Sequence, residues 1–300
     1  MQSGSGLVFV NGIRLYIHRF QPASARPSGL TVLLLHGFLD SGATWDLVAE
    51  PLARAGHDVL APDLRGFGES DSVGKGGYYH FPDYVGDISG LLDILAPKRL
   101  ALVGHSMGGA IAALFAGASP QRVDHLAVLE GLGLPGSDPG AAVDRMRTWL
   151  DDLRSLDRTP RPVGSFEEAT NRLARRHPRV PREILESRAR LLTRMHSGRL
   201  SWAYDPMHRT TAPIPFHLDA FKCFLRRITA PTLYVSGGVT GLRLPDEAER
   251  LACIPRALHV DLPDAGHMMH WTAPEALAER LLRFFASPEG RSSEKETTHG

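Results

Sequence analysis

The stretch that decides the fold is LVGHSMGGA, residues 102–110. It joins an apolar run typical of a buried strand to a run of small residues typical of a helix, and residues 104–108 between them fit G-x-S-x-G. A serine at the tip of such a strand-to-helix turn needs glycine neighbours, because the flanking backbones approach closely. We therefore predict that Ser106 is an exposed nucleophile. The Met107 amide, at the helix N-terminus, would stabilise a developing oxyanion.

Apolar runs and helical patterns alternate on both sides of this motif. Residues 31–40 and 123–131 carry near-continuous apolar runs, as expected of strands that are buried on both faces of a parallel sheet. Residues 81–96 instead repeat their apolar side chains at helical spacing. Near the N-terminus, Asn11-Gly12 divides two alternating runs and predicts a hairpin. The pattern indicates a mostly parallel sheet flanked by helices.

One long segment breaks this alternation. Residues 134–228 contain helical patterns rich in arginine and several prolines, and we find no convincing buried strand among them. We therefore expect a core made of residues 1–133 and 229–287, interrupted by a mainly helical insertion, residues 134–228. The last residues, 288–300, are polar and without periodicity, and we expect them to be disordered.

Composition excludes several classes of function. With a net charge of +1, the 300-residue chain lacks the basic excess of a nucleic-acid-binding protein. Cys223 and Cys253 show neither a disulfide framework nor metal spacing, which favours a reducing compartment. We find no signal peptide and no apolar run of the ~20 residues that a membrane span needs. The sequence therefore predicts a cytoplasmic protein, monomer or homodimer, without a membrane partner.

We also expect no cofactor and no metal. Residues 131–136, GLGLPG, match G-x-G-x-x-G after a strand, as a dinucleotide-binding loop would. That loop needs a helix to begin inside it, and Pro135 interrupts. The remaining sequence has no H-E-x-x-H zinc motif and no P-loop.

From about residue 7 to 286, these motifs make the chain resemble the α/β-hydrolase family. Residues 33–46 are similar to the family's His-Gly oxyanion loop, which implies that the Phe38 amide is a second oxyanion donor and that His36 supports the loop. Residues 262–275 are similar to the loop that carries the catalytic histidine, which implies His267. His270 remains its rival. Residues 61–71 resemble the turn after the fourth strand, which we interpret as structural around Asp63 and Arg65.

The resemblance implies an α/β-hydrolase fold with a mostly parallel central sheet flanked by helices and a helical cap inserted after the sixth strand. In the commonest family arrangement, the catalytic acid follows the first strand after the cap. Counting from Gly237, that position is Thr240, which cannot act as a carboxylate. Asp246, the next acid, reads as a helix N-cap.

Glu130 offers an alternative acid. It ends the apolar strand after the Ser106 helix, so it should emerge at the same edge of the sheet as Ser106. Haloalkane dehalogenases, within the same family, resemble this in drawing their acid from that neighbouring strand. Glu130 would accept a hydrogen bond from Nδ1 of His267. Alternatively, Glu130 bonds the amides of the following Gly-Leu-Gly, or the acid is Asp246 or Asp264.

The insertion takes the position of the family's cap, which covers the pocket. Its excess of arginine is typical of solvated helix faces. Alternatively, one of these arginines binds an anionic substrate. Trp202 lies in a W-x-x-D-P stretch that resembles a subgroup including serine-hydrolase-like proteins. The residues that we name as possible substrate contacts are His36, Leu39, His105, Trp202, Met268, Arg194 and Arg209.

We therefore predict hydrolysis of a small-molecule carboxylic ester through an acyl-enzyme, with Ser106, His267 and Glu130 as the triad. Phe38 and Met107 would form the oxyanion hole. Amide or lactone hydrolysis and acyl transfer remain alternatives on the same triad. A non-catalytic small-molecule receptor remains an alternative from another class. The serine at position 106 distinguishes the chain from dehalogenases and epoxide hydrolases, family members that use aspartate there.

Overall fold

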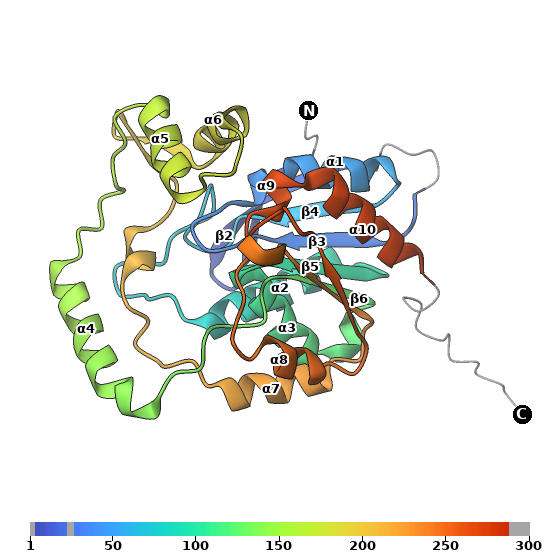
Figure 1. Cartoon of the computed structure of the whole chain (residues 1–300). Helices are drawn as coiled ribbons and strands as arrows, with labels where there is room; N and C mark the ends of the chain where they lie inside the picture. Colours follow the sequence, from blue (N-terminus) through green and yellow to red (C-terminus); the bar gives the residue numbers. More distant parts are fainter. Residues whose placement is uncertain (1–3, 23–26, 288–300) are drawn as a thin grey trace, which may run out of the picture.

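An eight-stranded sheet forms the centre of the molecule in the computed structural model (Figure 1), which describes residues 4–22 and 27–287. The predicted disordered tail, residues 288–300, lies outside the described residues. The strands of this sheet are β1 Gly6–Val10, β2 Ile13–Phe20, β3 Thr31–Leu35, β4 Asp58–Pro62, β5 Leu100–His105, β6 His125–Leu129, β9 Thr232–Ser236 and β10 Ala257–Asp261. The helices are α1 Asp46–Arg54, α2 Phe81–Leu95, α3 Met107–Ala118, α4 Ala142–Ser155, α5 Phe166–Arg176, α6 Arg182–Leu191, α7 Leu218–Arg227, α8 Glu247–Ala252, α9 Met269–Thr272 and α10 Pro274–Ala286.

The strand order is β1-β2-β4-β3-β5-β6-β9-β10, and every pairing from β4 to β10 is parallel. Only β1 and β2 run antiparallel to their neighbours. The predicted hairpin between them is confirmed, since Asn11 and Gly12 both have positive φ, as a tight two-residue turn requires. The mostly parallel sheet flanked by helices is likewise as predicted.

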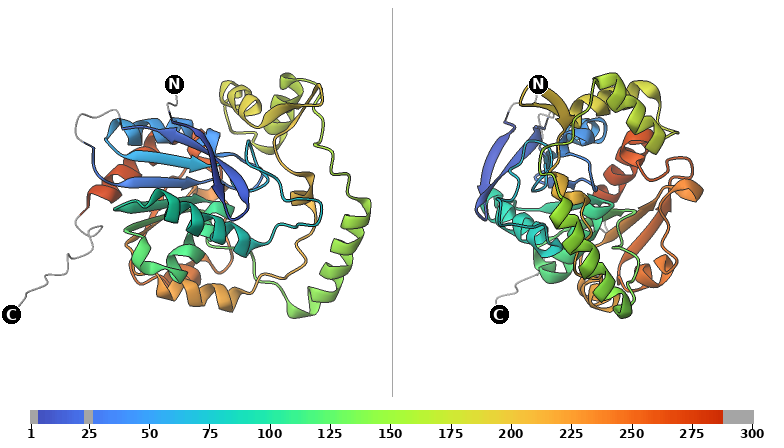
Figure 2. Two further views of the ribbon diagram at one scale, coloured as in Figure 1. Left: turned by 180° about the vertical axis from the view of Figure 1, so that it is seen from behind. Right: turned by 90° about the vertical axis from the view of Figure 1, so that its left-hand side faces the viewer.

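Side chains of each central strand point alternately to two hydrophobic layers. In β3, Leu33 and Leu35 belong to the core beneath α2, α3 and α7. Val32 and Leu34 belong to the opposite core, beneath α1, α9 and α10. Figures 1 and 2 show these two groups of helices on opposite faces of the sheet. Burial on both faces explains why the strands read as continuous apolar runs in the sequence.

The parallel register brings the carboxyl ends of four strands to one edge. Leu35 of β3 lies opposite Gly104 of β5, and His105 of β5 lies opposite Leu129 of β6. Leu129 in turn lies opposite Val235 of β9. The residues that follow these strand ends therefore meet at one place, where open α/β sheets hold their ligands.

The insertion lies between β6 and β9 and contains α4 to α7. Against the sequence reading, it also contains a hairpin of β7 Thr193–His196 and β8 Arg199–Trp202. This hairpin escaped sequence analysis because its strands are four residues long and partly exposed, so they form no apolar run. The division of the chain into a core and a cap, residues 134–228, stays a prediction.

Two parts of the insertion differ in how they pack. Helices α5 and α6 share a small core with Met268 and Trp271, which follow the loop of His267. Buried Arg188 of α6 forms an ion pair with Asp46 of α1, at 2.8 Å between Nη2 and Oδ1. By contrast, α4 buries none of its residues and stands apart from the sheet in Figure 2.

Two further observations bear on the sequence predictions. Within residues 4–22 and 27–287, the helices are all too short or too polar to cross a bilayer. Cys223 and Cys253 are both free thiols. The cytoplasmic location stays a prediction.

Candidate active site

Ser106 lies at a sharp turn between β5 and α3. Its φ of 53° and ψ of −117° are unusual for a residue with a side chain, and such strain concentrates at functional sites. The turn is possible because its neighbours are glycines. A Cβ on Gly104 would lie 2.3 Å from the carbonyl oxygen of Gly108, and one on Gly108 would lie 2.3 Å from that of Leu35. The close backbone approach that the motif predicts is therefore present.

His267 connects Ser106 to Glu130. Its Nε2 lies 3.1 Å from Oγ of Ser106, and its Nδ1 lies 2.8 Å from Oε2 of Glu130. Because a carboxylate only accepts hydrogen bonds, Nδ1–H donates to Glu130, which leaves Nε2 to accept from the Ser106 hydroxyl. This is the arrangement of a nucleophile, a base and a group that orients the base.

Glu130 is buried, with 3% of its surface exposed, and the loop after β9 holds it in place. The Gly237 amide donates to Oε1 at 2.5 Å, and the Leu242 amide donates to Oε2 at 2.7 Å. Glu130 also has a positive φ of 46°. This buried glutamate is therefore paired by His267 and two backbone amides. The amides come from residues 237 and 242, not from the Gly-Leu-Gly that follows Glu130 in sequence.

The loop of residues 237–242 is where a carboxylate is expected in the commonest family arrangement. Here it contributes backbone donors, and Gly241 makes room for the carboxylate that arrives from β6. A Cβ on Gly241 would lie 1.8 Å from Oε1 of Glu130. A residue with any side chain at position 241 would therefore displace Glu130.

The rival acids lie elsewhere. Asp246 occupies the N-cap position of α8 but makes no capping hydrogen bond, so our N-cap interpretation is corrected. Its Oδ2 instead accepts from Nε of buried Arg250 at 2.8 Å. Arg250 also donates to the carbonyls of Leu132 and Leu134, and so holds the chain that follows Glu130. Asp264 is exposed.

The rival histidine, His270, is fully buried on α9 and bonds to Asp40. Its Nε2 lies 3.0 Å from Oδ2 of Asp40. Burial lowers the pKa of His270, although the Asp40 carboxylate partly opposes this effect. Of the two histidines, only His267 is within hydrogen-bond distance of Ser106.

The loop after β3 lies beside Ser106. A Cβ on Gly37 would lie 3.2 Å from Cβ of Ser106, so only a glycine fits there. Phe38 follows, with its ring half exposed, and Leu39 has a positive φ of 59°. Met107, on the other side, is the first residue of α3, where an amide has no acceptor within the helix. The two amides that we predicted as oxyanion donors thus belong to segments that flank Ser106.

His36 supports this loop and is not open to a substrate. It is fully buried, its Nε2 accepts from the Leu64 amide at 3.0 Å, and its Nδ1 donates to the Gly37 carbonyl at 2.8 Å. Burial lowers the pKa of His36, which keeps the ring neutral for these two bonds. Its inclusion among the possible substrate contacts is therefore corrected.

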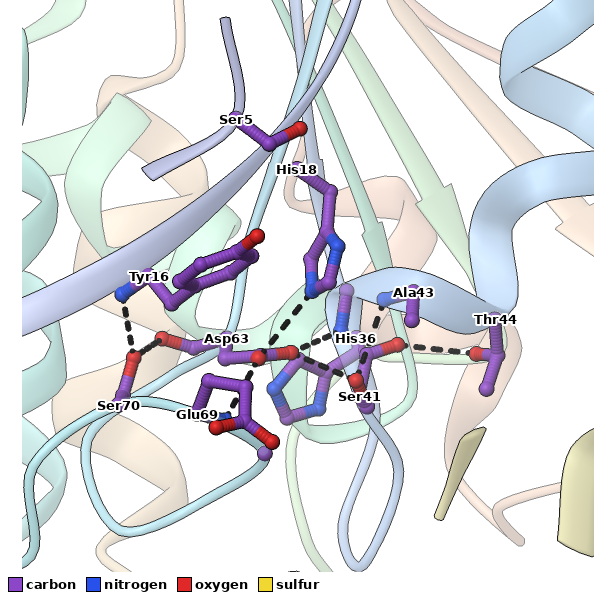
Figure 3. Close-up of polar contacts among 12 residues, drawn as sticks. Ser5, Tyr16, His18, His36, Ser41, Ala43, Thr44, Asp63, Glu69 and Ser70 are labelled. Atoms are coloured by element: carbon purple, nitrogen blue, oxygen red, sulfur yellow. Dashed lines mark hydrogen bonds and ion pairs between the residues drawn. The ribbon is translucent and has the colours of Figure 1, made fainter. Parts of the chain in front are cut away.

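Asp63, at the centre of Figure 3, anchors residues 41 and 42 of the loop after β3. Asp63 accepts from Oγ of Ser41 at 2.6 Å and from the Gly42 amide at 2.7 Å, and it also contacts His18. Burial alone would raise the pKa of Asp63, but the hydrogen bond from His18 and those from its other donors outweigh burial and lower it. The turn is structural, as interpreted. Arg65 is not part of this cluster, because it pairs with Asp87.

One group of described residues has the spacing of a metal site. Ligand atoms of Asp40, His105 and His270 lie within 4.8 Å of one another. All three residues are buried, Asp40 already pairs with His270, and Nε2 of His105 donates to the His267 carbonyl at 2.7 Å. We interpret the group as a support for the His267 loop. His105 is therefore a buried scaffold residue, and its inclusion among substrate contacts is corrected.

The remaining predicted contacts divide between two environments. Leu39, Trp202 and Arg209 line a cavity of about 350 Å³ between the oxyanion loop and the insertion. Met268 is instead buried in the core of α5 and α6, and Arg194 donates to the Gly68 carbonyl at 2.7 Å. Sequence analysis missed Arg161, Arg172, Arg175 and Arg176, which also line this cavity. The arginine-rich run of residues 171–183 held a signal, but it did not indicate which face points inward.

Comparison with known proteins identifies the family of this fold. The family model described as alpha/beta hydrolase fold matches residues 31–274. A serine hydrolase-like protein of Danio rerio is 25% identical over 91% of this chain and 86% of that protein. An epoxide hydrolase of Caballeronia sordidicola is 33% identical over 92% of each chain. Among solved structures, a thioesterase domain from the curacin biosynthetic pathway has a TM-score of 0.79 and 28% identity, over 93% of this chain and 98% of that one.

Proposed function

The chain belongs to the α/β-hydrolase fold family and is a hydrolase, and from this premise we propose that it cleaves carboxylic esters through a serine acyl-enzyme. The observation that carries the proposal is the continuous relay from Ser106 through His267 to Glu130, with contacts of 3.1 and 2.8 Å. A hydroxyl is a weak nucleophile by itself, and an adjacent oriented base is what activates it.

The proposed reaction has two halves. Oγ of Ser106 attacks the ester carbonyl while Nε2 of His267 takes its proton, and the alcohol leaves with that proton. Water then attacks the acyl-enzyme, giving its proton to His267, and the carboxylic acid leaves as Ser106 is protonated again. Glu130 stabilises the imidazolium in both halves. The amides of Phe38 and Met107 would receive the oxyanion.

Epoxide opening is not favoured at this site, although an epoxide hydrolase is among the relatives. If Ser106 attacked an epoxide carbon, the product would be an ether, which water does not cleave under these conditions. An enzyme of that class needs a nucleophile whose adduct is an ester. We therefore expect Ser106-dependent turnover of esters and none of styrene oxide, measured by chromatography of the diol.

A thioester substrate is the second candidate, supported by the similarity to a thioesterase domain. The same tetrahedral intermediate and the same oxyanion donors serve an ester and a thioester, since only the leaving atom differs. Matched oxygen and sulfur esters of one acyl group would rank the two by kcat/KM. Amide or lactone hydrolysis and acyl transfer have no separate observation in their favour.

The proposal is tested with a fluorophosphonate probe and short p-nitrophenyl esters. We expect rapid single labelling at Ser106, found by peptide mass spectrometry, and ester turnover that Ser106→Ala lowers by at least about 10⁴-fold. Asp264→Asn is the matched control, because it neutralises an exposed acid three residues before His267 and should change neither result. A folded protein that neither reacts with the probe nor hydrolyses any ester or thioester would favour the receptor alternative.

A further inference from the structure

The cavity beside the oxyanion loop is lined by five arginines, and we name it the arginine cavity. These are Arg161, Arg172, Arg175, Arg176 and Arg209, and none of the residues that line the cavity in the described part of the chain is a carboxylate. Its volume of about 350 Å³ falls in the range of small-molecule sites, roughly 300–1,000 Å³. We propose that the arginine cavity binds an anionic group, a carboxylate or phosphate, at the end of one arm of the substrate. This inference rests on the proposed function, because it names the substrate class of the same site.

Four of these arginines lack an ion-pair partner among the described residues. Only Arg172 forms a salt bridge, with Glu168 of its own helix. Asp205, the nearest carboxylate in sequence to Arg209, is used elsewhere, since it accepts from the Tyr79 hydroxyl and from the Met207 amide. The donors of Arg161, Arg175, Arg176 and Arg209 are therefore available to an incoming anion.

Helix stability explains only part of this arrangement. Arg175 and Arg176 lie in the last turn of α5, where the helix dipole favours a positive charge. Arg172 and Arg176, however, are like charges at i and i+4, an arrangement that destabilises a helix. Arg161 and Arg209 come from other segments, so no helix effect gathers them at the same cavity. A bound anion would relieve the mutual repulsion of all these charges.

The rest of the wall suits a short carbon chain. Leu39, Leu173, Trp202 and Tyr204 line the cavity with apolar surface, and Trp202 packs against both the main core and the core of α5 and α6. Small-molecule sites commonly combine such a wall with a few charged groups that fix orientation. A molecule with an apolar middle and an anionic end would match both parts.

The cavity is also close enough to Ser106 to serve the same substrate. Leu39 lines it, and Gly37, two residues earlier, packs directly against Ser106. Because consecutive Cα atoms are about 3.8 Å apart, the Cα atoms of Gly37 and Leu39 are separated by at most roughly 7.6 Å. The segment of residues 37–39 therefore connects the surroundings of Ser106 to the wall of the arginine cavity.

A binding experiment tests the inference without turnover. Isothermal titration calorimetry on Ser106→Ala protein would compare adipate, hexyl phosphate and neutral 1-hexanol. We expect both anions to bind more tightly than hexanol, with an affinity that falls as salt rises. Adding Arg161→Gln and Arg209→Gln should weaken anion binding by at least about tenfold, while Arg179→Gln should change it by less than about twofold. Arg179 is the matched control, because it is an exposed arginine of the same insertion that does not line the cavity.

Kinetics then connects binding to the reaction. The p-nitrophenyl half-esters of succinate, glutarate and adipate would be compared with neutral p-nitrophenyl esters of the same acyl length, after subtraction of spontaneous hydrolysis. We expect the ratio of kcat/KM for the anionic over the neutral ester to exceed one, and to fall about tenfold in Arg161→Gln/Arg209→Gln.

The inference and the proposed function fail in different ways. Anions that bind no better than hexanol, or equally well to the double variant, would overturn the anion site even if Ser106 hydrolyses neutral esters. A substrate ratio that the two arginine substitutions leave unchanged would do the same. Anion binding that depends on Arg161 and Arg209, in a protein without esterase activity, would support the site and overturn only the esterase proposal.

Discussion

The carboxyl edge of the sheet and the arginine cavity adjoin the same loop of residues 36–39, yet they are built in opposite ways. At the sheet edge, buried backbone holds each group in one position: Ser106 and Glu130 both have strained positive φ, and amides fix the carboxylate. In the arginine cavity, long side chains from separate segments converge on one space. The sheet thus fixes the groups that we propose cleave the ester, whereas the insertion contributes a more adaptable surface.

The two regions also tolerate change differently. Gly104, Gly108 and Gly241 each lie where a Cβ would collide with a fixed neighbouring atom. Arg161 and Arg209 are exposed, and their replacement would leave no buried group without a partner. Substitutions at the sheet edge should therefore alter kcat strongly, and substitutions in the cavity should alter substrate preference.

Among the substitutions of supporting residues, the largest effect is expected for Glu130→Gln. The amide keeps the shape of the side chain but cannot stabilise the imidazolium, and it can stabilise the wrong tautomer of His267. We expect kcat to fall by about 10³- to 10⁴-fold. The thermal midpoint should fall by only several degrees, because the amide nitrogen would face one backbone N–H that a carboxylate oxygen accepts in the wild type. Stopped-flow esterase assays and circular dichroism would measure the two quantities. If Glu130→Gln kept near-normal turnover while Asp246→Asn or Asp264→Asn lost it, the acid would have to be reassigned.

A smaller loss should follow Gly241→Ala. Its new Cβ would lie 1.8 Å from Oε1 of Glu130, so either the loop or the carboxylate must move. Because a small misplacement of an orienting group costs less than its removal, we expect kcat to fall by on the order of 10²-fold. Gly74→Ala is the control, since a Cβ there meets nothing within 4 Å. Equal activity in the two variants would mean that the loop of residues 237–242 is not the support of Glu130.

The smallest effect concerns the stability of the protein at acidic pH, through His208 of the insertion. His208 stacks between Phe67 and Tyr79, with ring centroids 3.9 and 3.8 Å away, and burial lowers its pKa to about 3. Below pH 6.5, the unfolded chain binds a proton at this histidine and the folded chain does not, so stability falls as pH decreases toward 3. Between pH 7 and 5, this one group should remove about 2 kcal/mol.

His208→Phe should remove that part of the acid sensitivity while keeping the stacked ring. Urea unfolding at pH 7 and pH 5 would give the difference, with His196→Phe, at an exposed histidine of the β7–β8 hairpin, as the control. Identical losses of unfolding free energy in wild type and His208→Phe would contradict the assignment. His125 and His177, with pKa values that burial lowers to about 4, would still contribute to the acid sensitivity of both proteins.

Much of the fold and of the candidate site was predictable from local sequence. Strand runs, helical spacing and the Asn11-Gly12 turn each depend on residues that are close in the chain. The G-x-S-x-G turn depends on glycines within two residues of Ser106. Glu130 was predictable from strand order, because neighbouring parallel strands end at one edge. The structure brings Ser106, His267 and Glu130 within hydrogen-bond distance, and their catalytic roles remain our proposal.

The interpretations that failed depend on which side chains are buried and what they contact. His36 and His105 look like pocket residues in the sequence, but both are buried and bonded to backbone of other loops. Asp246 looks like a helix cap, but a buried arginine one turn later takes its carboxylate. Nothing in the local sequence distinguishes a histidine or an aspartate that faces a cavity from one that supports a loop, because burial depends on what packs against it.

Periodicity and turn stereochemistry are local properties, and they were enough to predict the alternating architecture and the turn that carries Ser106. His267 was expected from the family resemblance, and Glu130 from the order of neighbouring strands. Only the tertiary structure decided that Gly241 and the amides of residues 237 and 242 hold Glu130. It also decided which arginines of the insertion share one cavity with Leu39. The physical reason is that these contacts join segments up to about 170 residues apart, whose relative positions are determined by core packing and not by any local preference.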